Sequence, residues 1–168
     1  MRAYAWTTLL VLSVSVVGCS DRVDFYQTVN EARSPGGGFH TGWIPSLLPP
    51  SARDIHVRYH PGSGGTWITF EYDPVDRAQM LRDVRRVGEE ELRRIFIQPT
   101  TDSWWDHRLS PAGLSHASES FPFQVFEHRH DVGWSNENMG RFRIGYLALH
   151  PGTTRAYYWS CGERVREK

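Results

Sequence analysis

Hydrophobic and polar residues alternate along two neighbouring segments, residues 55–60 and 66–72, as expected of half-buried β-strands. The first segment places Ile55, Val57 and Tyr59 on one face, and the second begins a similar alternation after Thr66. The glycine-rich stretch at residues 61–65 between them is a strong turn signal. The pattern therefore predicts a β-hairpin near the middle of the chain.

After residue 73 the hydrophobic spacing lengthens, which predicts the main helix of the protein over residues 74–87. Asp73 and Pro74 suit its N-cap and first position. A narrow apolar stripe follows at three-residue steps, formed by Val75, Ala78, Leu81 and Val84. Shorter helices are predicted at residues 25–33 and 89–96.

Three further strands are predicted in the C-terminal part, at residues 121–130, 141–149 and 155–161, with turn signals between them. Segregated hairpins and one main helix favour an α+β fold. We therefore expect an antiparallel sheet of about five strands in hairpins packed on one main helix. Residues 35–168 would form this single globular α+β domain.

The N-terminal residues indicate where in the cell the protein resides. Met1-Arg2 is a short basic start, and residues 3–17 carry no charge, a length typical of a secretory signal. The run ends in Val16-Val17-Gly18-Cys19, which resembles a bacterial lipobox. This predicts a lipoprotein signal peptide at residues 1–18, and then a lipidated cysteine, a tether and a short helix at residues 19–34.

An ordinary signal peptide and a short membrane anchor are the alternatives to this prediction. If Cys19 is acylated, for example with palmitate, more than one acyl chain would hold the domain on the membrane. Ser20 directly after the cysteine favours the outer membrane, facing the periplasm. Cys161 would then be the remaining thiol, either buried or able to pair between chains.

Composition narrows the classes of partner. The chain has 168 residues, 39% of them hydrophobic, with a formal net charge of +0 at pH 7. That composition suits one globular domain and argues against disorder. Without a basic field, no nucleic-acid partner is expected.

The central segment also resembles a group of proteins. Its residues Gly42-Trp43-Ile44-Pro45, Leu48-Pro49, Ser51-Ala52, Ile55 and Trp67-Ile68-Thr69-Phe70 are similar to a GW(L/I)P…LP.SA..I segment followed by a strand. This segment occurs in uncharacterised small bacterial lipoproteins and exported proteins. The resemblance covers residues 25–73 and extends to Tyr157-Tyr158-Trp159-Ser160. It implies an envelope protein and carries over no catalytic residues.

Three tryptophans are the candidates for an interaction surface: Trp104, Trp105 and Trp134. All three fall in irregular or polar segments, where functional residues concentrate. The alternative is that they cover the edge of the core. Paired tryptophans can stack on sugars or contact proteins, so the expected partner is an envelope protein or a glycan.

His128 and His130 form the alternative site, because two histidines two positions apart on a strand share a face. With His60 or Asp131 they could bind zinc, although the spacing of a structural zinc site is missing. We expect no catalytic residues and no cofactor. The sequence thus favours a membrane-anchored binding module, with an inhibitor or immunity-type lipoprotein as a subtype. The alternative is a small metal-dependent envelope hydrolase using His128 and His130.

Overall fold

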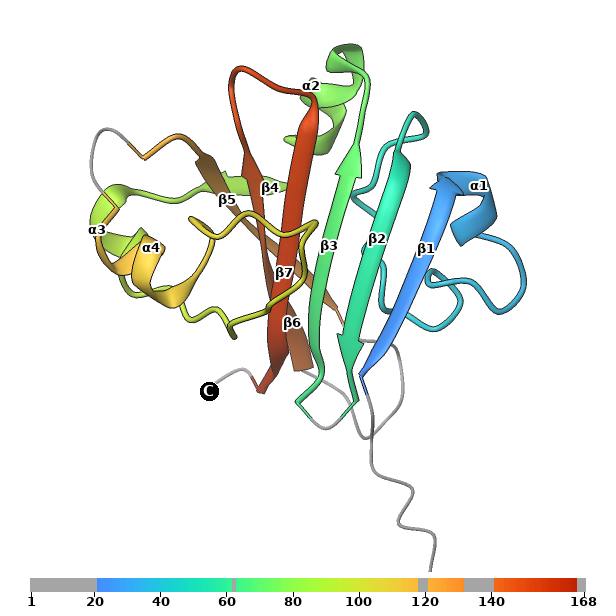
Figure 1. Ribbon diagram of the computed structural model, residues 1–168, viewed down its shortest axis with the longest axis horizontal. Helices are drawn as coiled ribbons and strands as arrows, with labels where there is room; N and C mark the ends of the chain where they lie inside the picture. The colour runs from blue at the N-terminus through green and yellow to red at the C-terminus, as the bar shows by residue number, and fades with distance from the viewer. Residues whose placement is uncertain (1–20, 62, 118–120, 132–140, 166–168) are drawn as a thin grey trace, which may run out of the picture.

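The computed structural model describes residues 21–61, 63–117, 121–131 and 141–165, and these form one seven-stranded antiparallel sheet (Figure 1). Its spatial order is β1-β2-β3-β7-β6-β5-β4, so β1 and β4 are the edges. The strands are β1 (Arg22–Thr28), β2 (Arg53–His60), β3 (Gly65–Glu71), β4 (Val84–Arg86), β5 (Gln124–Asp131), β6 (Arg141–Leu149) and β7 (Arg155–Val165). The helical segments are α1 (Val29–Ala32), η1 (Pro74–Asp76), α2 (Arg77–Met80), α3 (Glu89–Leu92) and α4 (Pro111–Ser115).

The hairpins expected from the alternating segments are present. β2 pairs with β3, and β5, β6 and β7 pair in succession, all antiparallel. The two groups join where β3 pairs with β7, with Trp67 opposite Trp159. This long-range pairing places the central hairpin and the last strand in the middle of one sheet.

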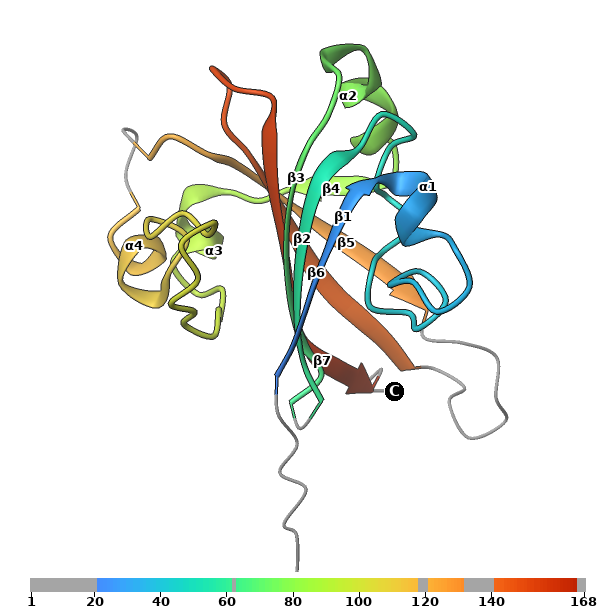
Figure 2. The ribbon, with the colours of Figure 1, turned by 45° about the vertical axis from the view of Figure 1, so that its right-hand side comes forward.

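Each face of the sheet carries its own core (Figure 2). On the first face, side chains of β2 and β3 such as Val57 and Phe70 pack under α1, residues 33–52 and α2. On the second face, Trp67, Tyr157 and Trp159 pack under the long segment 87–123, which contains α3 and α4. Two buried layers explain why β3 is enclosed over nearly its whole length.

The expected main helix at residues 74–87 is wrong, and so is the fold class built on it. The segment forms a short 3₁₀ turn, the four-residue helix α2 and then strand β4. Val75, the first residue of the proposed stripe, is 83% exposed, whereas Met80 is buried. Residues at strict three-residue steps stay on one side of a 3₁₀ helix, which has about 3.0 residues per turn. On an α-helix, with about 3.6 residues per turn, the same residues do not stay on one face. Val84 instead pairs with His128 of β5, where the edge of the sheet offers backbone partners.

The expected helix at residues 25–33 is correct only in its second half. Residues 22–28 form β1, which pairs with β2 along its length, and only Val29–Ala32 is helical. The spacing of Phe25, Tyr26, Val29 and Ala32 fits a helix, but Phe25 and Tyr26 point to opposite faces of the strand. The sheet therefore begins at Arg22, and the fold is a seven-stranded sheet with short helices.

Within the part of the chain that the structure describes, no helix has the length and apolar character needed to cross a membrane.

Candidate functional site

The covering segment on the second face stops at β2 and leaves the adjoining part of β1 and β2 open (Figure 1). Of the large hydrophobic side chains that the structure describes, four are exposed: Val23 at 52%, Phe25 at 49%, Val75 at 83% and Phe96 at 62%. Two of them, Val23 and Phe25, are neighbours on the same face of β1. They form a continuous apolar surface on the edge strand, whereas Val75 and Phe96 lie in two other segments of the chain.

A row of rings crosses from β1 to the covering segment. The Phe25 and His56 ring centroids are 4.8 Å apart, and His56 stacks on Trp104 at 5.6 Å with an interplanar angle of 20°. We call Val23, Phe25, His56 and Trp104 the open face. It is an aromatic and aliphatic surface on which the Phe25 ring is tilted by 51° to the His56 ring.

The margin of the open face is held in place by polar contacts from the covering segment. The Trp67 indole Nε1 donates to the Gln98 carbonyl at 3.1 Å. Arg58 Nε lies 2.9 Å from an Asp102 carboxylate oxygen. These contacts fix residues 98–102 across β2 and β3, so the position of Trp104 beside His56 follows from them.

The structure separates the two neighbouring tryptophans. Trp105 is 8% exposed, donates its Nε1 hydrogen to the Leu109 carbonyl at 2.8 Å, and meets Tyr157 and Trp159 edge to face. It therefore has a packing role, which corrects its place in the proposed interaction surface. Trp104 is half-buried and keeps one side toward the open face. Trp134 lies outside the described residues.

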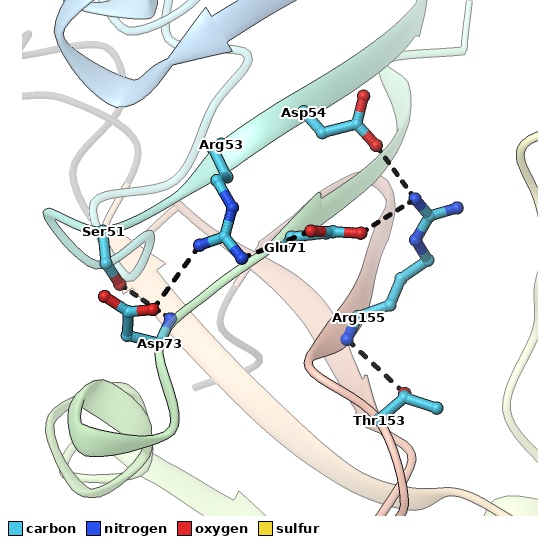
Figure 3. Close-up of polar contacts among 7 residues, drawn as sticks. All are labelled: Ser51, Arg53, Asp54, Glu71, Asp73, Thr153 and Arg155. Carbon is cyan, nitrogen blue, oxygen red and sulfur yellow. Dashed lines mark hydrogen bonds and ion pairs between the residues drawn. The ribbon is translucent and has the colours of Figure 1, made fainter.

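A polar network borders the open face at the ends of β2, β3 and β7 (Figure 3). A β-bulge lies between Arg53 and His56, and Asp54 within it has φ of 50°. Aspartate tolerates this left-handed conformation better than most residues. The bulge lets the Asp54 carboxylate reach Arg155 at 2.9 Å and the His56 imidazole at 3.3 Å. The His56 ring is therefore oriented from one side by a carboxylate.

The remaining members of this network link two arginines through one carboxylate. Glu71 lies between Arg53, at 3.3 Å, and Arg155, at 3.4 Å. Arg53 also lies 3.5 Å from Asp73, whose backbone N–H donates to the Ser51 hydroxyl at 3.0 Å. Asp73 occupies the N-cap position of η1, with Pro74 next to it as expected, but its side chain makes no capping hydrogen bond.

A pocket of about 320 Å³ adjoins the network and is lined by Asp106, Arg108, Phe123, His150 and Tyr157, among others. The Arg108 guanidinium hydrogen-bonds Asp106 and lowers the pKa of that carboxyl. Burial, reinforced by Asp106, raises the pKa of the Tyr157 hydroxyl. Because Arg108 and Arg155 are each already paired with carboxylates, the pocket offers no uncompensated charge and fits a structural role.

The histidine pair does not form a described site. His128 lies on β5, is 6% exposed, and faces the first core beside Tyr158; burial lowers its pKa. The side chain of His130 lies outside the described residues. Among the residues described, no group of three histidine, cysteine, aspartate or glutamate side chains could hold a metal ion. Metal-dependent hydrolysis remains a prediction that no observation favours.

Cys19 lies outside the described residues, as does the side chain of Cys161, so lipidation stays a prediction. Sequence reasoning missed Val23, Phe25 and His56 as surface candidates. Val23 and Phe25 are two positions apart and so share a face of a strand, but this spacing does not tell whether that face is covered.

Comparison with known proteins gives one match. Residues 22–71 match the model of the YbbD head domain, a segment that runs from the first residue of β1 to the last residue of β3. No curated protein and no solved structure matches the chain. The matched segment covers under a third of the 168 residues and contains three of the four open-face residues. This chain is thus similar over residues 22–71 to the YbbD head domain, which indicates a bacterial exported protein family.

Proposed function

We propose that the protein is an envelope-associated binding module that is anchored through acyl chains on Cys19 and contacts a partner protein through the open face. The exposed pair Val23 and Phe25 carries the proposal, since these side chains lie together on one face of β1, whereas the neighbouring central strands contribute to a core on each face. Contiguous exposed apolar surface on a folded domain marks an interaction site more often than scattered residues do.

The chemistry of the open face supports a protein partner. Phe25 packs at an angle on the His56 ring and Trp104 stacks on it, so the surface is aromatic. Aromatic residues dominate the binding free energy of protein interfaces, where a polar rim excludes water around them. The Asp54, Arg58 and Asp102 side chains provide such a rim.

β1 adds a second means of contact. As the edge strand of the sheet, it is paired on one side by β2, and no other strand among the described residues pairs with its other side. An extended segment of a partner can pair with such an edge and place side chains beside Phe25. The open face and the edge would then belong to one interface.

The proposal is tested by photo-crosslinking in the cell envelope, with a photoreactive residue at position 25 or, as a matched control, at position 96. Phe96 is also exposed but lies far along the chain, in the region of α3. We expect one protein to crosslink from position 25 and not from position 96. After purification of that protein, Phe25→Ser and Trp104→Ala should each weaken its binding by about tenfold or more.

Equal crosslinking from both positions, or unchanged affinity in both variants, would contradict the proposed interface. Binding of a glycan instead of a protein, again lost in Phe25→Ser, would replace the partner class. The anchor is tested separately: Cys19→Ser should abolish palmitate labelling and membrane fractionation. The two histidines provide a further control, because His128→Ala/His130→Ala should leave partner binding intact in any variant that folds.

A further inference from the structure

A second aromatic cluster lies at the end of the sheet where β1 begins. The Trp43 and Tyr59 rings stack with centroids 4.5 Å apart and an interplanar angle of 14°. The Arg22 guanidinium carbon lies 4.6 Å from the centroid of the Trp43 ring. We call Arg22, Trp43 and Tyr59 the basal stack. All three side chains are partly or fully exposed.

We propose that the basal stack rests in the headgroup layer of the membrane and orients the anchored domain. This inference rests on the proposed acylation of Cys19. Arg22 is three residues after Cys19, so the chain can place them at most about 11 Å apart. Because acyl chains hold Cys19 at the bilayer surface, the covalent chain keeps the basal stack within reach of the headgroups.

The composition of the stack fits that location. Tryptophan and tyrosine concentrate at the membrane–water interface, where an apolar ring and a polar tip are both accommodated. The Arg22 guanidinium lies over the Trp43 ring, and its N–H groups can donate to phosphate oxygens at the same level of the membrane.

The charges around the stack indicate that its aromatic rings, rather than attraction to acidic lipids, would drive the membrane contact. Arg22 is paired with Asp24 at 2.9 Å. Asp21 lies 3.4 Å from Arg58 and 3.6 Å from His60. Because acids and bases nearly balance, we expect the contact to depend little on the anionic lipid content or on salt.

This placement has a consequence for the rest of the molecule. The start of β1, the end of β2 and the β2–β3 turn lie at one end of the sheet, whereas α2 and the β6–β7 turn lie at the other (Figures 1 and 2). With the basal stack at the membrane, the strands rise from the surface by about 27 Å over the eight residues of β2. The open face then points sideways along the membrane, toward neighbouring envelope proteins.

The test measures quenching of tryptophan fluorescence by brominated lipids. The acylated protein, purified from bacterial membranes, is reconstituted into phosphatidylethanolamine vesicles with or without phosphatidylglycerol. We expect quenching in the wild type and loss of most of it in Trp43→Phe, in both lipid mixtures. Trp104→Phe is the matched control and should keep the quenching, since the open face stands off the membrane. Equal quenching in wild type and Trp43→Phe would overturn the inference.

A second arrangement separates failure of this inference from failure of the anchor. The Cys161→Ala variant of the chain beginning at Cys19 is coupled through Cys19 to a maleimide lipid in the same vesicles. Quenching lost in Trp43→Phe here, together with no natural acylation of Cys19, would refute the anchor and support membrane contact by the stack. Natural acylation without Trp43-dependent quenching in either arrangement would leave the anchor standing and refute the stack as a membrane contact.

Discussion

Trp104 and Trp105 are neighbours in the sequence, yet they belong to two different halves of the second face. Trp105 lies in the covered half, enclosed by Tyr157 and Trp159 and hydrogen-bonded through its indole. Trp104 lies at the margin of the open half and stacks on His56. The same residue type thus stabilises the fold at one position and offers contact surface at the next. Residue type alone cannot assign these roles, because they depend on where the covering segment ends.

The covered half depends on a long connection that is tied down at both ends. Residues 98–109 are held by the Trp67 and Trp105 indoles, which donate to the Gln98 and Leu109 carbonyls. The connection reaches β2 through the ion pair of Arg58 and Asp102, and the second core contains no residue of β1 among those described. The open half is therefore a consequence of how far the connection reaches.

The largest expected difference between the halves is in stability. Trp105→Ala should lower the free energy of unfolding by about 3–5 kcal/mol, because it empties a packed site and removes an indole hydrogen bond. Trp104→Ala should cost about 1 kcal/mol or less, since only one side of the ring is packed. Urea denaturation of both variants checks this. Similar losses in the two variants would break the comparison.

Close packing on the first face of the sheet, whose core contains Tyr158, is tested by adding a methyl group. A Cβ on Gly145 would lie 1.9 Å from the Tyr158 hydroxyl oxygen, and Tyr158 is 1% exposed. Gly145→Ala should therefore cost about 1–3 kcal/mol through overpacking. Gly88→Ala is the matched control, because its added methyl meets no atom within 4 Å. Thermal melting that ranks Gly88→Ala as the more harmful change would contradict this packing.

The loss of protein stability at acidic pH should also reveal that His128 is buried. Burial lowers the pKa of His128 below its ordinary 6.5, so the unfolded chain binds a proton there before the folded protein does. The contribution of this group is full above about pH 6.5 and is lost as the pH falls toward the folded pKa. The slope cannot exceed about 1.4 kcal/mol per pH unit for one proton. Urea midpoints between pH 7.5 and 5 should fall less steeply in His128→Gln than in the wild type.

The smallest expected effect is at the open face. Phe25→Thr replaces an exposed side chain with a residue that also favours strands, so stability should change by about 0.5 kcal/mol or less. Chemical denaturation measures this directly. A loss above about 2 kcal/mol would mean that Phe25 is packed in the folded protein, and the open half would not be open.

The local strand pattern was readable from the sequence alone. Strict alternation predicted the hairpin of β2 and β3, and turn residues separated β5, β6 and β7 at nearly the observed positions. These signals are local, because period-two alternation and turn-forming residues act within a few positions. The family match over β1 to β3 falls on the same region that the sequence resemblance identified.

The remaining features were decided by tertiary contacts. Val84 pairs with β5 and Phe25 pairs with β2, although the spacing of their segments suggested helices. Backbone pairing with an available strand edge stabilises these segments more than their weak helical pattern does. The open face depends on three segments that are far apart in the sequence: β1, β2 and the connection carrying Trp104. Exposure is set by what packs over a residue, and such long-range packing leaves no periodic mark in the sequence. The sequence therefore determined the strands and the hydrophobic residues available to them, while the tertiary structure decided which of those residues remain at the surface.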